Sequence, residues 1–121
     1  MKILIVDDSR TMRLVLRRML AELGHDDVIE AAHGGEGLER MTDDLPELAL
    51  VDWNMPVMGG LDFVKAVREQ RAYDKVKLMV VTSESSPRIV YEALKAGADE
   101  YAMKPITGDI MDDKMQLLGL S

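Results

Sequence analysis

Four short apolar runs in this chain each end at polar residues that can take part in phosphoryl chemistry. Runs rich in Ile, Leu and Val are typical of buried strands in a parallel sheet. The runs and the polar residues that follow them are 2–6 with Asp7 and Asp8, 48–51 with Asp52, 78–81 with Thr82, and 101–103 with Lys104. Open parallel α/β sheets bind ligands beyond the carboxyl ends of their strands. The sequence therefore predicts that these polar side chains meet at one edge of a sheet.

Helical patterns separate the strands. Apolar residues between Met12 and Leu23 recur at helical spacing, with Ser9 as the expected N-cap and Gly24 as the terminator. Ser86 is likewise the expected N-cap of a later helix, because the proline that follows it suits the first helical position. A further strand is expected near 28–32. Five strands and five helices in strict alternation predict an α/β fold with a parallel sheet covered on both faces.

Several local features of the helices are also predicted. Two adjacent glycines, Gly34 and Gly35, are expected to break the chain after the second strand, and both histidines, His25 and His33, are expected in solvated loops. After the breaker-rich loop 52–60, the sequence predicts inward-facing Leu61, Val64 and Val67. A last helix is expected over about 107–118. It carries two methionines, and exposed methionine would suit an adaptable binding surface.

Length and composition restrict the function. A chain of 121 residues suits one domain, which we expect over residues 1–121. It contains no cysteine, which excludes disulfides and thiolate metal sites. A net charge of −7 disfavours nucleic acid as a partner. No apolar run approaches the ~20 residues that a membrane helix needs, and the first strand is too short for a signal peptide. We therefore expect a cytoplasmic protein.

The three aspartates predict a metal site. Two carboxylates ~4 Å apart repel each other by ~4 kcal/mol at an effective dielectric near 20. A site that gathers Asp7, Asp8 and Asp52 must therefore hold protons or bind a cation, and oxygen ligands without His or Cys favour Mg²⁺. Lys104 could pair with a phosphoryl oxygen and Thr82 could donate a hydrogen bond to another. An aspartate nucleophile forming an acyl phosphate then becomes plausible.

Each residue also has a purely structural interpretation. Asp8 can begin a helix, Asp52 can form a turn, and Thr82 suits any strand. Lys104 can be an ordinary surface lysine. The functional prediction depends on the joint pattern, because four strand ends acquire suitable chemistry together.

Longer motifs strengthen this pattern. The segments 5–9 (IVDDS), 52–60 (DWNMPVMGG), 81–84 (VTSE) and 103–105 (MKP) resemble the receiver domain of two-component response regulators, and more narrowly its stand-alone chemotaxis members. The resemblance covers essentially the whole chain. It implies a flavodoxin-like three-layer fold with strand order 2-1-3-4-5, and a receiver without an output domain. This sequence departs from the family pattern at Ser83, where alanine is common in the family, and in its acidic last helix.

The resemblance implies that Asp52 accepts a phosphoryl group from a sensor histidine kinase. Mg²⁺ would be bound by Asp8, Asp52 and the backbone carbonyl of Asn54, with Asp7 acting mainly through water. Two further residues complete the implied site. Lys104, in a cis peptide bond with Pro105, and Thr82 would contact the phosphoryl oxygens.

The resemblance also implies a switch. Tyr101 would turn inward when Thr82 moves toward the phosphoryl group. The helix that begins after Ser86, the strand 101–103 and the last helix would then present a face to a downstream protein. Asn54 and Glu84 would flank the path of the attacking water and set the phosphoryl lifetime. The unphosphorylated chain is expected to be a monomer, with autophosphorylation and autodephosphorylation as its only catalysis.

Alternative functions remain open from the sequence. The chain could be a receiver excised from a larger response regulator, a phosphorelay intermediate or a phosphate sink. An aspartate-nucleophile phosphatase of the haloacid dehalogenase type would need a general acid two residues after its nucleophile, where Asn54 cannot protonate a leaving group. In a flavodoxin-like electron carrier, Asp7 and Asp8 would repel the flavin phosphate.

Overall fold

Five parallel strands form the centre of the protein, in a computed structural model that describes residues 1–120. The strands are β1 (Ile3–Val6), β2 (Val28–Ala31), β3 (Leu48–Val51), β4 (Lys77–Thr82) and β5 (Glu100–Met103). They lie in the order β2-β1-β3-β4-β5, which confirms the predicted α/β fold and its strand order. Each strand lies within one or two residues of its predicted position.

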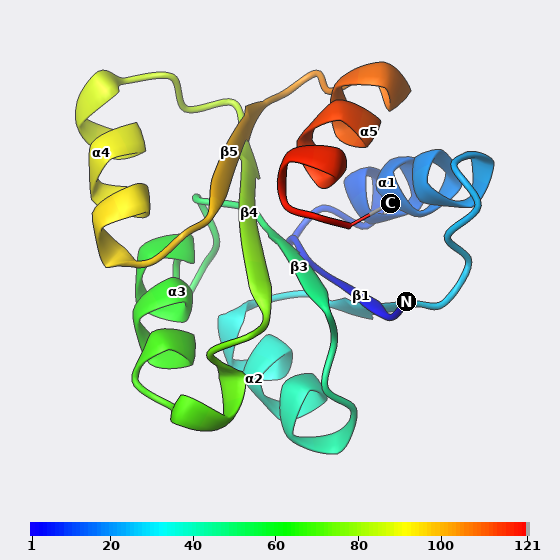
Figure 1. Cartoon of the computed structure of the whole chain (residues 1–121). Coiled ribbons are helices and arrows are strands. Elements are labelled where there is room, and N and C mark those ends of the chain that lie inside the picture. Colours follow the sequence, from blue (N-terminus) through cyan, green and yellow to red (C-terminus); the bar gives the residue numbers. More distant parts are fainter. Residues whose placement is uncertain (121) are drawn as a thin grey trace.

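Helices cover both faces of this sheet. They are α1 (Arg10–Glu22), α2 (Gly34–Asp43), α3 (Gly60–Arg68), α4 (Pro87–Ala96) and α5 (Gly108–Leu117). Helices α2, α3 and α4 lie on one face, and α1 and α5 lie on the other (Figure 1). A short 3₁₀ helix, Arg71–Tyr73, was not predicted. Among residues 1–120, no helix combines the length and the apolar character needed to cross a bilayer.

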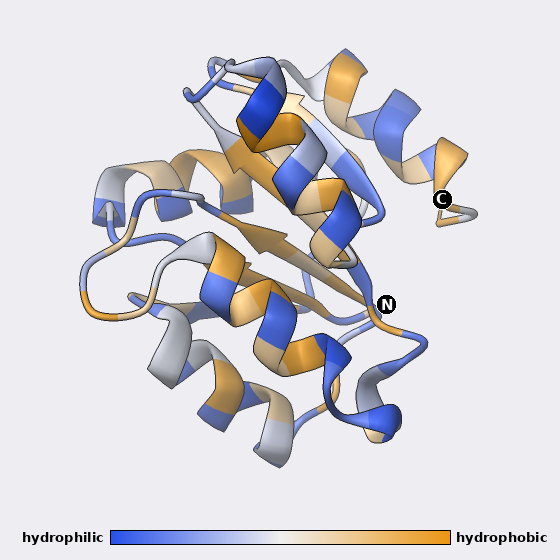
Figure 2. Ribbon diagram, turned by 90° about the vertical axis from the view of Figure 1, so that its left-hand side faces the viewer, coloured by the Kyte–Doolittle hydropathy of each residue, from blue (hydrophilic) through white to orange (hydrophobic). Residues whose placement is uncertain are grey.

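The strands are apolar throughout because both of their faces are buried. Neighbouring side chains point to opposite faces, so Leu4 and Val6 enter one core and Ile3 and Ile5 enter the other. All of β1 is fully buried. Figure 2 shows the same division, with strands coloured as hydrophobic and helices striped with hydrophilic residues. This arrangement explains the continuous apolar runs in the sequence.

Two predicted helix starts are confirmed. The Ser9 hydroxyl oxygen accepts a hydrogen bond from the backbone N–H of Met12 at 3.1 Å, so Ser9 is the N-cap of α1. Pro87 occupies the first turn of α4, as predicted. At the other end of α4, Gly97 has φ +121°, a conformation that favours glycine.

The second helix begins earlier than predicted, although the strand before it does end and His33 does lie in the connecting loop. Gly34 and Gly35 lie in the first turn of α2, and His33 is its N-cap, since Nδ1 accepts a hydrogen bond from the backbone N–H of Glu36 at 3.1 Å. Glu36 Oε1 accepts in turn from the backbone N–H of Ala32 at 2.8 Å. This reciprocal arrangement resembles a capping box with histidine in place of serine.

Two predictions about buried side chains also need correction. Leu61 is only half-buried, whereas the neighbouring Phe63 is completely buried against the sheet together with Val64 and Val67. The methionines of the last helix, Met111 and Met115, are both fully buried in the core beneath α5. They therefore fill the core, and methionine offers no binding surface on that helix.

At the edge of the sheet opposite the predicted site, Arg68 joins several segments of the chain through hydrogen bonds. Its guanidinium donates hydrogen bonds to the backbone carbonyls of Gly97, Tyr73 and Val76 at 2.9, 3.1 and 2.8 Å. It also pairs with the carboxylate of Asp99 at 2.8 Å. One side chain thus joins the end of α3 to the segments that follow α4 and precede β4.

Candidate functional site

The hydrogen bonds of the sheet bring the predicted polar residues to one edge. Val6 pairs with Val51, so Asp7 and Asp52 follow at the same level. The backbone N–H of Asp52 donates to the carbonyl of Val6 at 2.9 Å. On the other side of the site, the backbone N–H of Lys104 donates to the carbonyl of Thr82 at 2.9 Å. Backbone pairing therefore fixes the positions of all these side chains.

Three carboxylates converge at this edge. One oxygen each from Asp7, Asp8 and Asp52 lies within 4.8 Å of the others. Asp7 and Asp52 are buried, with 2% and 8% exposure, whereas Asp8 is exposed and leaves the site open to solvent. Three oxygen ligands, one of them accessible, fit a hard divalent cation such as Mg²⁺.

Lys104 supplies the positive charge of the site. Its ammonium lies 2.9 Å from Oδ2 of Asp7 and 3.5 Å from Oδ1 of Asp52. The other oxygen of Asp7, Oδ1, accepts a hydrogen bond from the backbone N–H of Ser9 at 2.8 Å. Asp7 is thereby held in place, and one ammonium faces more than one carboxylate.

The environment of Asp52 favours its neutral form. Burial is the largest influence and raises the pKa of Asp52, and the nearby charge of Asp7 raises it further. Lys104, the Thr82 hydroxyl and the backbone N–H of Trp53 act in the opposite direction. The pKa of Asp52 remains above its ordinary value, so the ionised carboxylate is held in an unfavourable environment that a bound cation would relieve.

Two residues from different loops meet above the site. The side-chain amide of Asn54, in the loop after β3, donates a hydrogen bond to Oε1 of Glu84 at 2.8 Å. Asn54 is exposed, Glu84 is half-buried and Thr82 is buried. The family resemblance implied a shared role for these two residues, and the structure places them in direct contact.

Tyr101 is buried and contacts the same residue. Its hydroxyl donates a hydrogen bond to the backbone carbonyl of Glu84. Burial raises the pKa of Tyr101, and the charges of Glu84 and Asp52 add to this effect. Glu84 thus accepts a hydrogen bond from Asn54 at its side chain and one from Tyr101 at its backbone carbonyl. These bonds link the loop after β4 to the loop after β3 and to β5.

The segment after Asp52 is closely fitted. A Cβ on Gly60, the first residue of α3, would lie 2.5 Å from the carbonyl oxygen of Asp52. Further along this loop, Val57 is fully exposed and has φ +68°, which is unfavourable for a β-branched residue. The peptide bond between Lys104 and Pro105 is cis.

Sequence reasoning missed two residues that support the site. Gly60 allows the start of α3 to lie close to the backbone of Asp52. The only sign of this in the sequence is that Gly60 is the second of two adjacent glycines. Arg13 donates a hydrogen bond from Nη1 to the backbone carbonyl of Asp7 at 2.7 Å, and its Nε pairs with Glu30 at 3.0 Å. Nothing local in the sequence shows that Arg13, in α1, reaches the end of β1.

Comparison with known proteins agrees with this geometry. The family model for the response regulator receiver domain matches residues 3–116. A chemotaxis protein CheY homolog from Campylobacter jejuni is 43% identical over 117 residues, which cover 96% of this chain and 90% of the relative. Chemotaxis protein CheY1 from Helicobacter pylori is 40% identical over 119 residues, which cover 98% and 96%.

Solved structures give the same result. Vibrio cholerae chemotaxis protein CheY4 superposes with a TM-score of 0.90 at 34% identity, covering 97% of each chain. The signal receiver domain of a signal transduction histidine kinase from Syntrophus aciditrophicus gives a TM-score of 0.87 at 28% identity, covering 97% of this chain and 88% of that one. The chain therefore belongs to the response regulator receiver domain family, and its relatives include CheY chemotaxis proteins.

Proposed function

We propose that this chain is a phosphorylation-switched signalling protein in which Asp52 accepts a phosphoryl group from a sensor histidine kinase. The observation that carries the proposal is the position of Asp52, a buried carboxylate 3.5 Å from the ammonium of Lys104 and beside two further aspartates. A carboxylate oxygen of Asp52 attacks phosphorus and the bond from phosphorus to the kinase histidine breaks. The departing imidazole nitrogen takes a proton from solvent and leaves as neutral imidazole.

The residues of the site divide the remaining work. Lys104 and the hydroxyl of Thr82 bind oxygens of the transferred group; Thr82 ends β4, which lies beside β3, and Lys104 follows β5, which pairs with β4. The carboxylates of Asp8 and Asp52 and the backbone carbonyl of Asn54 would hold Mg²⁺, with Asp7 acting through water. When bound, the ion neutralises charge on both the carboxylate and the phosphoryl group.

The output is a change in the face formed by α4, β5 and α5. Thr82 moves toward the phosphoryl group, and Tyr101 responds because its hydroxyl is bonded to the loop that follows Thr82. A few kcal/mol of differential binding is enough to redistribute two such conformations. The CheY relatives support a chemotaxis-type output through a protein partner. The receiver within a histidine kinase supports the alternative of a phosphorelay role.

Fluorescence of Trp53, adjacent to Asp52, tests the site. The protein is titrated with Mg²⁺ and then with beryllofluoride, which mimics an acyl phosphate. We expect a saturable, Mg²⁺-dependent change that disappears in Asp52→Asn and persists in the control Asp74→Asn, an exposed aspartate outside the site. Mass spectrometry after acetyl phosphate treatment should show one added phosphoryl group. Its absence, or its presence in Asp52→Asn, would refute the proposal.

A further inference from the structure

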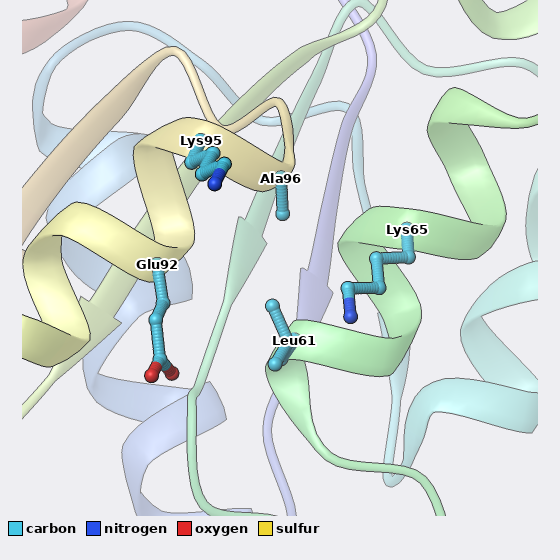
Figure 3. A pocket seen from close by; sticks show the side chains of 5 residues that line it. All are labelled: Leu61, Lys65, Glu92, Lys95 and Ala96. Atoms are coloured by element: carbon cyan, nitrogen blue, oxygen red, sulfur yellow. The ribbon is translucent and has the colours of Figure 1, made fainter.

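Helices α3 and α4 leave an open groove between them. It encloses about 470 Å³ and is lined by Leu61 and Lys65 from α3 and by Glu92, Lys95 and Ala96 from α4. Figure 3 shows the side chains of Leu61 and Ala96 pointing into the space between the two helices. The volume lies within the ~300–1,000 Å³ range of pockets that bind ligands.

The groove is preformed by the core beneath it. Phe63, Val64 and Ala93 are completely buried on the inner sides of the two helices and belong to one hydrophobic cluster. Their packing holds the inner sides of α3 and α4 against the sheet. Leu61 and Ala96 are left half-buried, so a guest side chain placed against them would remove further apolar surface from water.

Two lysines at the rim carry uncompensated positive charge. Lys65 and Lys95 are exposed, and within residues 1–120 neither has a carboxylate at ion-pair distance. The carboxylate of Glu92 is engaged by Arg88 at 3.0 Å. The Lys95 ammonium lies 5.7 Å from the centre of the Tyr91 ring. This positive rim contrasts with the net charge of −7 of the whole chain.

We propose that this groove is a docking site for an acidic peptide segment of a partner protein that inserts one large apolar side chain. The apolar side chain packs against Leu61 and Ala96, and flanking carboxylates pair with Lys65 and Lys95. Charge complementarity selects this occupant, since an acidic segment meets the lysines while the rest of the acidic surface repels it. A basic segment would place like charges at the rim.

This surface is separate from the face proposed for phosphorylation-dependent output. That face uses α4, β5 and α5, whereas the groove uses α3 and the opposite side of α4. Among residues 1–120, no hydrogen bond or ion pair joins a residue of the groove to Asp52. Because peptide binding is measured on the unphosphorylated chain, a failure of docking and a failure of phosphoryl transfer are distinguished by separate experiments.

Nuclear magnetic resonance titration of the full chain tests the proposal. The probe is acetyl-Glu-Asp-Leu-Phe-Asp-Glu-amide, followed by backbone amide shifts. We expect saturable shifts centred on Leu61, Lys65, Lys95 and Ala96. Replacing the Leu-Phe pair of the peptide by Ser-Ser should weaken binding about tenfold, and a peptide with lysines in place of its acidic residues should not bind.

Charge-reversal variants provide matched controls. Lys65→Glu and Lys95→Glu should each weaken binding about tenfold, while Lys75→Glu, an equal charge change at an exposed lysine outside the groove, should change it less than about twofold. Asp52→Asn should bind the peptide normally. Equal losses in all three charge variants, or shifts confined to the arginines of α1, would overturn the proposal. A dimer seen by sedimentation and abolished by Lys65→Glu would make a second copy the occupant instead.

Discussion

The side-chain amide of Asn54 is hydrogen-bonded to the carboxylate of Glu84 at 2.8 Å, and this contact joins the loops that follow β3 and β4. The hydroxyl of Tyr101 donates a hydrogen bond to the backbone carbonyl of the same glutamate. Both loops border the carboxylate of Asp52. A change in the position of Glu84 would therefore alter its hydrogen bonds with both Asn54 and the buried Tyr101.

The first prediction concerns this contact. Asn54→Ala and Glu84→Ala should each change the rate of phosphoryl loss from Asp52, and the double variant should differ from the sum of the two effects because they share one hydrogen bond. The unfolding free energy should change by less than about 1 kcal/mol, since the bond is largely exposed. Dephosphorylation is followed by loss of the phosphorylated mass. Strict additivity of the two rate effects would contradict the coupling.

The second prediction concerns the competition between Lys104 and a metal ion. Lys104→Gln removes an ammonium that lies 2.9 Å from Asp7 and 3.5 Å from Asp52. Mg²⁺ affinity, measured by calorimetry, should rise about threefold or more because the ion no longer competes with the ammonium for carboxylates. Without metal, the unfolding free energy should fall by about 1–3 kcal/mol, since buried carboxylate charge loses its partner. Lys75→Gln serves as the control, and unchanged Mg²⁺ affinity in Lys104→Gln would refute the competition.

The third prediction concerns pH. Burial raises the pKa of Asp52 in the folded protein above its ordinary value of 3.8. The folded state then binds the proton more tightly, so the contribution of Asp52 to stability is present below pH 3.8 and is lost as the pH rises through the higher folded value. Asp52→Asn cannot ionise and escapes this loss. In metal-free buffer its unfolding free energy should exceed that of the wild type at neutral pH.

Urea unfolding at a series of pH values measures this difference. The gap between Asp52→Asn and the wild type should widen from about pH 4 upward and then become constant. Asp74→Asn, at an exposed position, should show no comparable widening. A gap of the same size at pH 3 and pH 7 would mean that Asp52 does not titrate differently in the two states.

The fourth prediction concerns Gly60. Its Cβ would lie 2.5 Å from the Asp52 carbonyl oxygen and 2.8 Å from Trp53 Cα, and neither backbone atom can move without disturbing the site. Gly60→Ala should lower the unfolding free energy by about 1–3 kcal/mol. Gly108→Ala is a matched control at the first residue of α5, with nothing within 4 Å of the added carbon. It should be neutral or stabilising, by about 0.4–1 kcal/mol.

The fifth prediction concerns Val57, which is fully exposed at φ +68°. Asparagine tolerates this conformation better than a β-branched residue, so Val57→Asn should raise the unfolding free energy by about 1 kcal/mol. The control is Val15→Asn, an exposed position in the regular helix α1, where asparagine should be slightly unfavourable. Thermal unfolding of both variants measures the difference, and destabilisation by Val57→Asn would contradict the argument.

The sequence predicted the parallel sheet and its polar edge well, because both follow from short-range rules. Apolar runs gave the strands, and a polar residue directly after a strand can only lie at its carboxyl end. Asp7, Asp52 and Lys104 therefore met as expected. The strand order came from the family resemblance, since no local feature determines which strands become neighbours.

Features that depend on tertiary contacts were not predicted. Gly34 lies in the first turn of α2, and a Cβ there would come within 2.6 Å of the Met58 side chain, so this glycine permits a close approach and does not form a turn. His33 lies in the loop before α2 as predicted, but its role as the N-cap was not predicted, because histidine is an uncommon N-cap. The burial of Met111 and Met115 depends on how α5 packs against the sheet. The contact between Asn54 and Glu84 required the relative position of two loops 30 residues apart in the chain.

Arg68 has a consequence for the motion of α4. It bonds the carbonyl of Gly97, directly after the helix, and the carboxylate of Asp99, whereas the Ser86 side chain makes no capping hydrogen bond at the other end. Arg68 thus holds the segment directly after the last turn of α4, whereas the first turn has no side-chain cap. Displacement of the loop that contains Glu84 should swing α4 as a lever about this pivot, with its first turn travelling farthest.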